Sequence, residues 1–347
     1  MAEPAERPIG SGAEALGAVV ALAPDRGAHQ TAARRPGAAH YLKLRMGLRR
    51  GLSLWIVERP GLSLPPDGQA ALLEEMRVVA RKVLPAGQLD YGVLSGDRER
   101  LENAVVTLIR DTATGAPVAF NALAVMRMSL AGRPVEVLHL GLVMVDPGWR
   151  GRGLSEVLYG LTCVLLFLRG QCRPLRLSNV TQVPAVFGMV GETFDNVFPA
   201  PANPDAPTFE HRMLARQIMA HHRHVFGVGA EAVFDQRRFV IENAYTGGSD
   251  DLKKTLADAP RHRIEAYNAM CARELDYDRG DDFLQIGQIN MEAARRYLSR
   301  VVKPMSAPWL GGRLLLFALA SLVMPVLHWL ADDQPWGVLR PRRSARP

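Results

Sequence analysis

The sequence predicts an α/β fold of the α+β kind, in which helices flank a mixed sheet. Strand-like and helical patterns alternate along residues 100–215 in the order β-β-β-α-β-α-β. A turn of Asp, Thr, Ala and Gly at 111–115 predicts a hairpin between the first two strand-like runs. Hydrophobic residues make up 48% of the 347 positions, enough to fill a sizeable core without disulfides.

The N-terminal region predicts little regular structure before residue 50. Residues 1–39 are mainly Ala, Gly, Pro and Arg without a sustained period, which predicts a disordered arm. Residues 52–58 predict a first strand. Apolar residues at steps of three and four predict an amphipathic helix over 68–83.

The central region, 40–215 with its best-marked part at 100–215, predicts the main domain. Val- and Ala-rich runs predict strands over 104–109, 117–128 and 135–145. Leucine and valine then recur at helical steps from Leu154 until Arg169-Gly170 ends the pattern. A strand over 175–180, a short helix over 184–190 and a strand over 194–198 complete the series.

The C-terminal part carries no motif of known chemistry. Helical patterns over 263–274 and 291–301 predict a helical extension over 216–308. The last segment, 309–347, holds an apolar run, 314–330, and an arginine-rich tail. As a helix this run would span roughly 25 Å, just short of a bilayer core. It predicts a helix packed on the protein, a peripheral membrane contact through 309–330, or a span.

Composition restricts the class of protein only broadly. A net charge of +7 suits a polyanionic cofactor, an anionic membrane or nucleic acid, without choosing among them. Three cysteines without C-x-x-C spacing favour a reducing, cytoplasmic compartment. The histidines at 211, 221, 222 and 224 lack an acidic partner for a metal site, and the aspartates at 276–282 predict a polar turn.

A glycine- and arginine-rich turn at 146–153 separates the third central strand from the helix that follows. Such a turn leaves helix N-terminal N–H groups free to bind a phosphate, and its glycines let the backbone approach the ligand. Its arginines can reach the outer oxygens of that phosphate. The residues predicted to bind phosphate are Arg150, Gly151, Arg152, Gly153, Leu154 and Ser155.

The spacing Arg150-x-x-Gly153-x-Ser155 resembles the [Q/R]-x-x-G-x-[G/A] signature of the GNAT superfamily of acyl-CoA-dependent N-acyltransferases. Ser155 stands where that family usually has Gly or Ala. The resemblance covers about 100–215 and implies a mostly antiparallel sheet that splays open between its two central strands. It also implies that the loop holds the pyrophosphate of coenzyme A and that the pantetheine arm lies beside Val143, Met144 and Val145. A basic surface turn before a core helix is the alternative.

The resemblance also suggests a catalytic base. Relatives that use a direct base often place a glutamate eleven residues before the first position of the signature, which is His139 here. Imidazole titrates near neutrality, so His139 is the first candidate and Glu136 the second. On a regular strand Glu136 would face away from His139. The alternative role for His139 is a half-buried group that satisfies a backbone partner.

Three further roles follow from the resemblance. A backbone N–H near Val143 would stabilise the oxyanion, and Asn179 would contact the pantetheine amides, unless it only forms a turn. Many relatives carry a tyrosine as general acid, and the matching position here is Phe187, with Glu192 where they have Phe. Phenylalanine cannot donate a proton, so the thiolate would leave unaided or be protonated by water.

The sequence thus predicts transfer of an acyl group, most often acetyl, from acyl-CoA to an amine, without a metal. The amine acceptor would be a small or lipid-like molecule, and we expect no nucleic-acid partner. Two alternatives remain: a lipid-directed or long-chain N-acyltransferase at a membrane surface, and a non-catalytic module that binds acyl-CoA.

Overall fold

The computed structural model describes residues 41–48, 51–84, 92–203, 206–247, 249 and 252–301, with isolated positions at 312, 315, 319, 322 and 323. The predicted N-terminal arm, 1–39, lies outside these residues, as does most of the apolar run 314–330. Among the described residues no helix is long and apolar enough to cross a membrane.

A single large sheet organises the described chain, and it contains ten strands. Their order across the sheet is β1-β2-β3-β4-β5-β6-β10-β9-β8, with β7 paired to β10. All described pairs are antiparallel except β5 with β6. The strands are β1 (Lys43–Leu48), β2 (Leu52–Glu58), β3 (Ala104–Asp111), β4 (Pro117–Leu130), β5 (Arg133–Val145), β6 (Leu175–Thr181), β7 (Asp195–Phe198), β8 (Val233–Asp235), β9 (Val240–Glu242) and β10 (Asp282–Ile289).

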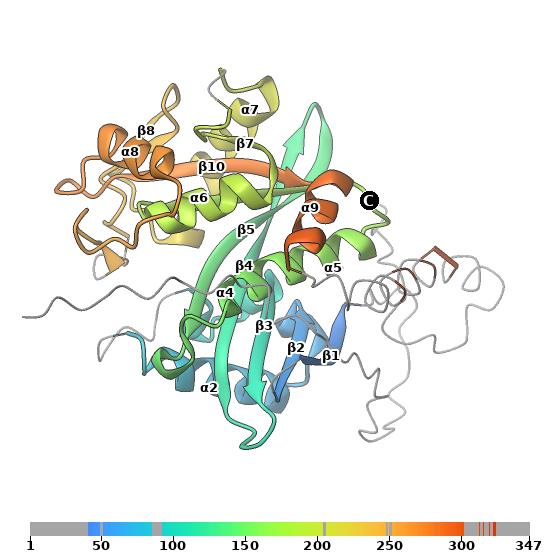
Figure 1. Ribbon diagram of the computed structural model, residues 1–347. Coiled ribbons are helices and arrows are strands. Elements are labelled where there is room, and N and C mark those ends of the chain that lie inside the picture. The colour runs from blue at the N-terminus through green and yellow to red at the C-terminus, as the bar shows by residue number, and fades with distance from the viewer. Residues whose placement is uncertain are drawn as a thin grey trace, which may run out of the picture.

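Helices pack on both faces of this sheet (Figure 1). The α-helices are α1 (Pro60–Ser63), α2 (Pro66–Ala80), α3 (Arg98–Glu102), α4 (Leu154–Glu156), α5 (Thr162–Arg169), α6 (Pro184–Thr193), α7 (Phe209–Gln217), α8 (Glu265–Glu274) and α9 (Met291–Val301). Short 3-10 helices are η2 (Gly92–Ser95), η3 (Pro147–Trp149) and η6 (Arg223–Phe226), and π-helices are η4 (Val157–Leu161) and η5 (Ile218–His222).

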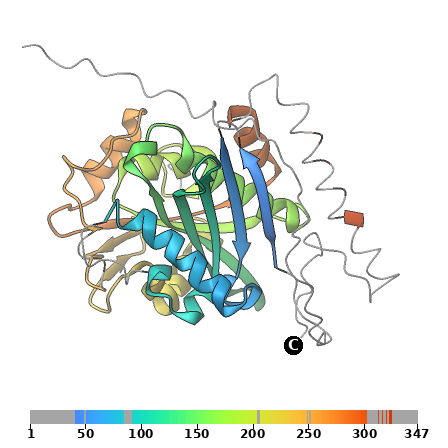
Figure 2. The ribbon, with the colours of Figure 1, turned by 90° about the horizontal axis from the view of Figure 1, so that it is seen from below.

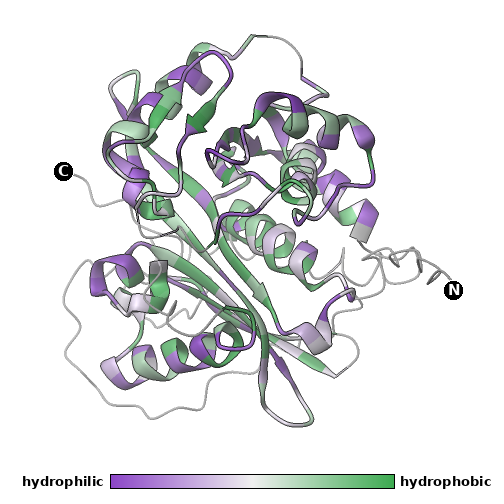
Figure 3. Cartoon of the chain, turned by 90° about the vertical axis from the view of Figure 1, so that its left-hand side faces the viewer, coloured by the Kyte–Doolittle hydropathy of each residue, from purple (hydrophilic) through white to green (hydrophobic). Residues whose placement is uncertain are grey.

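The core forms separate apolar layers on the two faces. One cluster joins β1 and β2 to α5 and α9, and a second joins α2 and α3 to β3, β4 and β5. Figure 2 shows α2, in blue, lying across the strands. The strands are largely hydrophobic, whereas the outer helices alternate hydrophilic and hydrophobic residues (Figure 3). This alternation is the amphipathic pattern that buries one helix face against a sheet.

Most predicted elements of the central region are present. The strands predicted from Leu52, Ala104, Pro117 and Leu175 begin at those residues, and the helix predicted from Leu154 continues through α4, η4 and α5 to Arg169. The α/β class and the mostly antiparallel sheet flanked by helices are therefore confirmed.

The prediction of a helical extension over 216–308 was only partly right, because the region also holds strands. This region contains α8 and α9 but also β8, β9 and β10, and β10 pairs with β6 from Phe283 to Ile289. Polar Asp282, Gln285 and Gln288 interrupt the apolar run of β10, which hid the strand from pattern analysis. Hydrogen bonds make the burial of two of them possible: Gln285 accepts from Asn179 at 3.0 Å and Asp282 accepts from Tyr245 at 3.1 Å.

Candidate functional site

The turn between β5 and α4 is exposed and tightly bent. Gly151 and Gly153 adopt φ of 74° and 72°, the left-handed region that disfavours side chains. A Cβ added at Gly151 would meet nothing within 4 Å, so open space lies beside this backbone. Arg150, Gly151, Arg152 and Ser155 are exposed, while Leu154 is buried beneath them and anchors the start of the helix.

The N–H groups of this turn are available to a ligand. Val157 N donates to Gly153 O at 3.3 Å, the first backbone bond of the helix, and Arg150 N donates to Pro147 O. Within the described residues, the N–H groups of 151–156 donate to no protein acceptor. Six consecutive amides at a bend and helix start are the arrangement that binds phosphate oxygens.

Three basic side chains lie at the turn, and each has a different environment. Arg150 is exposed, whereas the Arg152 guanidinium lies 4.4 Å from the centroid of the Trp149 ring. Lys82, two residues after the end of α2, donates to Asp146 at 2.6 Å, and Asp146 accepts from Gly148 N at 2.9 Å. These bonds lower the pKa of Asp146 and fix the base of the turn. No sequence pattern indicated that Lys82 would lie here.

A β-bulge in β5 stands between this turn and His139. Ala122 pairs with Leu142 and Ala124 with His139, so one residue of β4 opposes two of β5. A Cβ added at Gly141 would lie 2.6 Å from Ala122 O, which explains the glycine. Tyr159, in η4, donates to Gly141 O at 2.8 Å and ties the bulge to the helix after the turn.

The inner edge of β5 is open over the residues predicted to meet pantetheine. In the described chain β5 pairs with β6 at Val137, Leu138 and His139, and beyond His139 it pairs only with β4. Val143, Met144 and Val145 belong to this second part. Figure 1 shows β5 curving away from β10, the strand on the far side of β6. Unpaired strand edges present N–H and C=O groups that can bind an extended ligand.

His139 lies at the last β5–β6 pair and is only 3% exposed. Its Nδ1 lies 3.1 Å from Ser178 Oγ on β6, and its ring centroid lies 5.1 Å from that of Phe226. Burial lowers the pKa of His139 to about 4. The imidazole is therefore neutral near pH 7 and can accept a proton, but it is a weaker base than a solvated histidine.

His139 also lines a cavity of about 350 Å³. The cavity has a partly apolar floor from β4 and β5, and its other walls come from η2, α3 and η6. Two further histidines, His222 and His224, line it, and their rings lie 6.4 Å apart. The sequence marked these two as candidate metal ligands or surface residues and gave no sign that they approach His139. Among the described residues no group of His, Cys, Asp and Glu could hold a metal ion.

Glu136 is placed away from this cavity. It is held by Arg59, whose Nη2 donates to Glu136 Oε1 at 3.1 Å, and it is not among the cavity residues. This agrees with the alternation of side chains along a strand, which turns 136 and 139 to opposite faces. The carboxylate therefore forms an ion pair with buried Arg59 while remaining partly exposed, and His139 alone of the two candidates faces the cavity.

Asn179 and Phe187 are both buried in the protein interior. The Asn179 amide is 1% exposed and donates to Gln285 of β10, directly opposite it in the sheet. Phe187, in α6, stacks on Phe283 with ring centroids 4.6 Å apart. Phe187 is thus a core residue, and in this arrangement the Asn179 amide group is used within the sheet.

The remaining polar residues singled out in the sequence have local partners. His211 is buried, and Thr208 N donates to its Nδ1 in the capping box of α7. Asp281 accepts from Asp276 N and pairs with Arg279 in the turn before β10.

Comparison with known proteins assigns no family. The chain matches no profile of a protein family, and no curated protein matches its sequence.

Proposed function

We propose that this chain is an acyl-CoA-dependent N-acyltransferase of the GNAT type. The observation that carries the proposal is the exposed turn at 150–156, whose free amides, left-handed glycines and nearby arginines suit a diphosphate. The charge of the diphosphate would be balanced by Arg150 and, at the helix start, by the positive end of the helix dipole.

The geometry between the turn and His139 supports an extended donor. Six residue steps along β5, from His139 to Val145, span roughly 20 Å at the usual rise of a strand. A pantetheine arm paired with the open edge at Val143–Val145 would bring the thioester toward the bulge at Gly141. The cavity that His139 and Gly141 share would then receive the acceptor.

The proposed reaction needs one proton to leave the amine. The acceptor nitrogen attacks the thioester carbon, the nitrogen–carbon bond forms, and the carbon–sulfur bond breaks. The proton passes from the amine to His139 directly or through water, while a backbone N–H near Val143 stabilises the oxyanion. Because Phe187 is a core residue, the departing thiolate takes its proton from solvent or leaves as the anion.

A non-catalytic acyl-CoA-binding module is the second candidate. Phe187, which the resemblance aligns with the general-acid tyrosine, stacks on Phe283 in the core, and the low pKa of His139 weakens its action as a base. Turnover therefore separates the two candidates, whereas donor binding does not.

Donor binding and turnover are tested with the full chain. Acetyl-CoA and a long-chain acyl-CoA are titrated by calorimetry, and free thiol is followed across a panel of amines. We expect the Arg150→Ala/Arg152→Ala double variant to bind donor at least tenfold more weakly, because each lost guanidinium contact to phosphate is worth about 1.5–3 kcal/mol.

Arg261→Ala is the matched control, since Arg261 is an exposed arginine paired with Glu265 far along the chain. Equal donor affinity in the double variant and the control would reject the phosphate site. Binding without thiol release from any amine would favour the binding module, and a preference for long chains would favour the lipid-directed transferase.

A further inference from the structure

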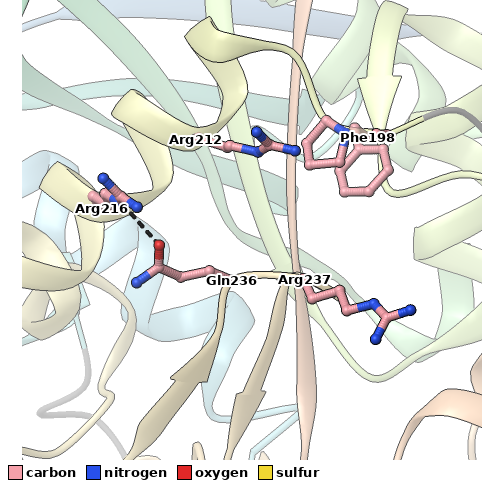
Figure 4. Close-up of a pocket in the computed structure, with 7 residues that line it drawn as sticks. Phe198, Arg212, Arg216, Gln236 and Arg237 are labelled. Carbon is pink, nitrogen blue, oxygen red and sulfur yellow. Dashed lines mark hydrogen bonds between the residues drawn. The ribbon is translucent and has the colours of Figure 1, made fainter.

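A basic hollow lies between α7 and the turn that joins β8 to β9. It has a volume of about 640 Å³ and is lined by Phe198, Ala206, Pro207, Arg212, Arg216, Gln236 and Arg237. In Figure 4, Arg212 points toward Phe198, Arg216 faces Gln236, and Arg237 extends from the opposite wall. Figure 1 places α7 and β8 well away from α4, so this hollow is separate from the turn at 150–156.

The lining of the hollow is cationic. Its described lining holds three arginines and no carboxylate, and all three arginines are exposed. The carboxylates nearest in sequence to Arg212 and Arg237 have other partners: Glu210 pairs with Arg176, and Asp235 pairs with Arg238 at 2.6 Å. The positive charge of the wall is therefore not neutralised by these two acids.

Two features prepare the wall for a ligand. Arg216 Nε donates to Gln236 Oε1 at 2.7 Å, which orients the guanidinium across the hollow. Phe198 packs edge-to-face against Phe239, with ring centroids 4.9 Å apart, and Pro207 adds a second apolar surface to the hollow. A guanidinium fork matches two oxygens of a phosphate, whereas an apolar wall favours an organic group beside it.

We propose that this hollow binds a small phosphorylated molecule, with Arg212 and Arg216 contacting the phosphate and Arg237 adding charge from the other side. The organic part of the ligand would lie against Phe198 and Pro207. The proposal is independent of the acyltransferase function, because none of these residues belongs to the turn or to the His139 cavity.

The test uses ribose 5-phosphate and inorganic pyrophosphate as probes, with a short single-stranded RNA for comparison, each titrated by calorimetry into the full chain. The titrations use the Arg150→Ala/Arg152→Ala background, in which binding at the turn is weakened. We expect binding of at least one probe, with affinity that falls as salt is raised. Adding Arg212→Gln or Arg216→Gln should weaken it at least tenfold, and adding both should abolish it.

Arg261→Gln in the same background is the control and should leave the affinity unchanged. Both target arginines are exposed, so thermal unfolding should show that the variants remain folded. The proposal is overturned if neither probe binds, if the arginine variants bind as the control does, or if only a short single-stranded RNA binds. Loss of donor binding at the turn has no bearing on this outcome.

Discussion

Desolvation determines the chemistry of His139 more than any charged neighbour does. Its imidazole is removed from water, and its described polar partner is the Ser178 hydroxyl. The charged form is therefore disfavoured, and the pKa falls to about 4. From residue type alone, histidine is expected to titrate near neutral pH and so to serve as a base. In the folded chain His139 is instead neutral near pH 7 and would accept a proton only during the reaction.

For His139→Gln we expect a changed pH dependence of stability. In the wild type the unfolded chain binds a proton at His139 below pH 6.5, whereas the folded chain does so only near pH 4. Stability from this group is thus present above pH 6.5 and is lost as the pH falls toward 4, by about 2 kcal/mol between pH 7 and pH 5. Urea unfolding at the two pH values should show this loss in the wild type and not in the variant.

Subtracting the pH dependence of the variant's stability from that of the wild type leaves the contribution of His139. Other titrating groups with the opposite effect on stability cancel. Burial raises the pKa of Asp282 to about 7, so that group favours folding as the pH falls. If His139 is also the base, thiol release at pH 7 should drop about a hundredfold while donor affinity is kept. If the variant kept full activity and the same pH dependence of stability as the wild type, His139 would be neither the base nor a buried neutral histidine that affects stability.

At the scale of elements, the bulge in β5 joins the two parts of the proposed site. It switches which face of the strand each side chain occupies, so that Leu138 and Leu140 share a cluster with Val143 and Val145. A regular strand would place these pairs on opposite faces. The hydrogen bond from Tyr159 to Gly141 holds the bulge against the helix that begins at the turn.

Gly141→Ala tests this element. The added methyl group would lie 2.6 Å from Ala122 O, a backbone atom that cannot move without disturbing the β4–β5 pairing. We expect a loss of about 2 kcal/mol in the free energy of unfolding and reduced thiol release. Gly148→Ala is the control for stability, since its methyl group would lie 3.5 Å from Asp146 Oδ1. Equal stability of the two variants would contradict the tight bulge.

At the scale of the whole molecule, residues from the C-terminal part complete the sheet. β10 pairs with β6 on one side and with β7 and β9 on the other. Its residues Leu284 and Ile286 belong to an apolar cluster shared with β5 and α7. Tyr297 of α9 packs so closely on Gly160 that a Cβ there would lie 1.9 Å from its ring.

Truncation tests whether this region is separable. A chain ending at residue 281 lacks β10 and α9, so β6 would present a bare edge and the shared cluster would be exposed. We expect this chain to be insoluble or unfolded, whereas a chain ending at residue 301 should fold. Soluble yield and far-UV circular dichroism measure the difference. A folded 281-residue chain would show that 40–215 is independent of β10.

Local patterns were sufficient for the elements of the central region. Continuous runs of Val, Ala and Leu located the strands at Ala104 and Pro117, which are buried on both faces over much of their length, and helical spacing located the helix from Leu154. They failed for β10, where buried Gln285 depends on Asn179, Phe187 O and Pro199 O from distant segments. Polar residues buried through such long-range partners leave no periodic signal.

The chain by itself determined the turn at 150–155, because its glycines and arginines and the helix behind it are consecutive in sequence. It also placed His139 and Glu136 on opposite faces, since side chains alternate along a strand. Only the tertiary structure decided that His222 and His224 line the His139 cavity and that burial lowers the pKa of His139. Both the approach of these histidines and the removal of His139 from water depend on packing between segments distant in sequence, so local sequence patterns do not predict them.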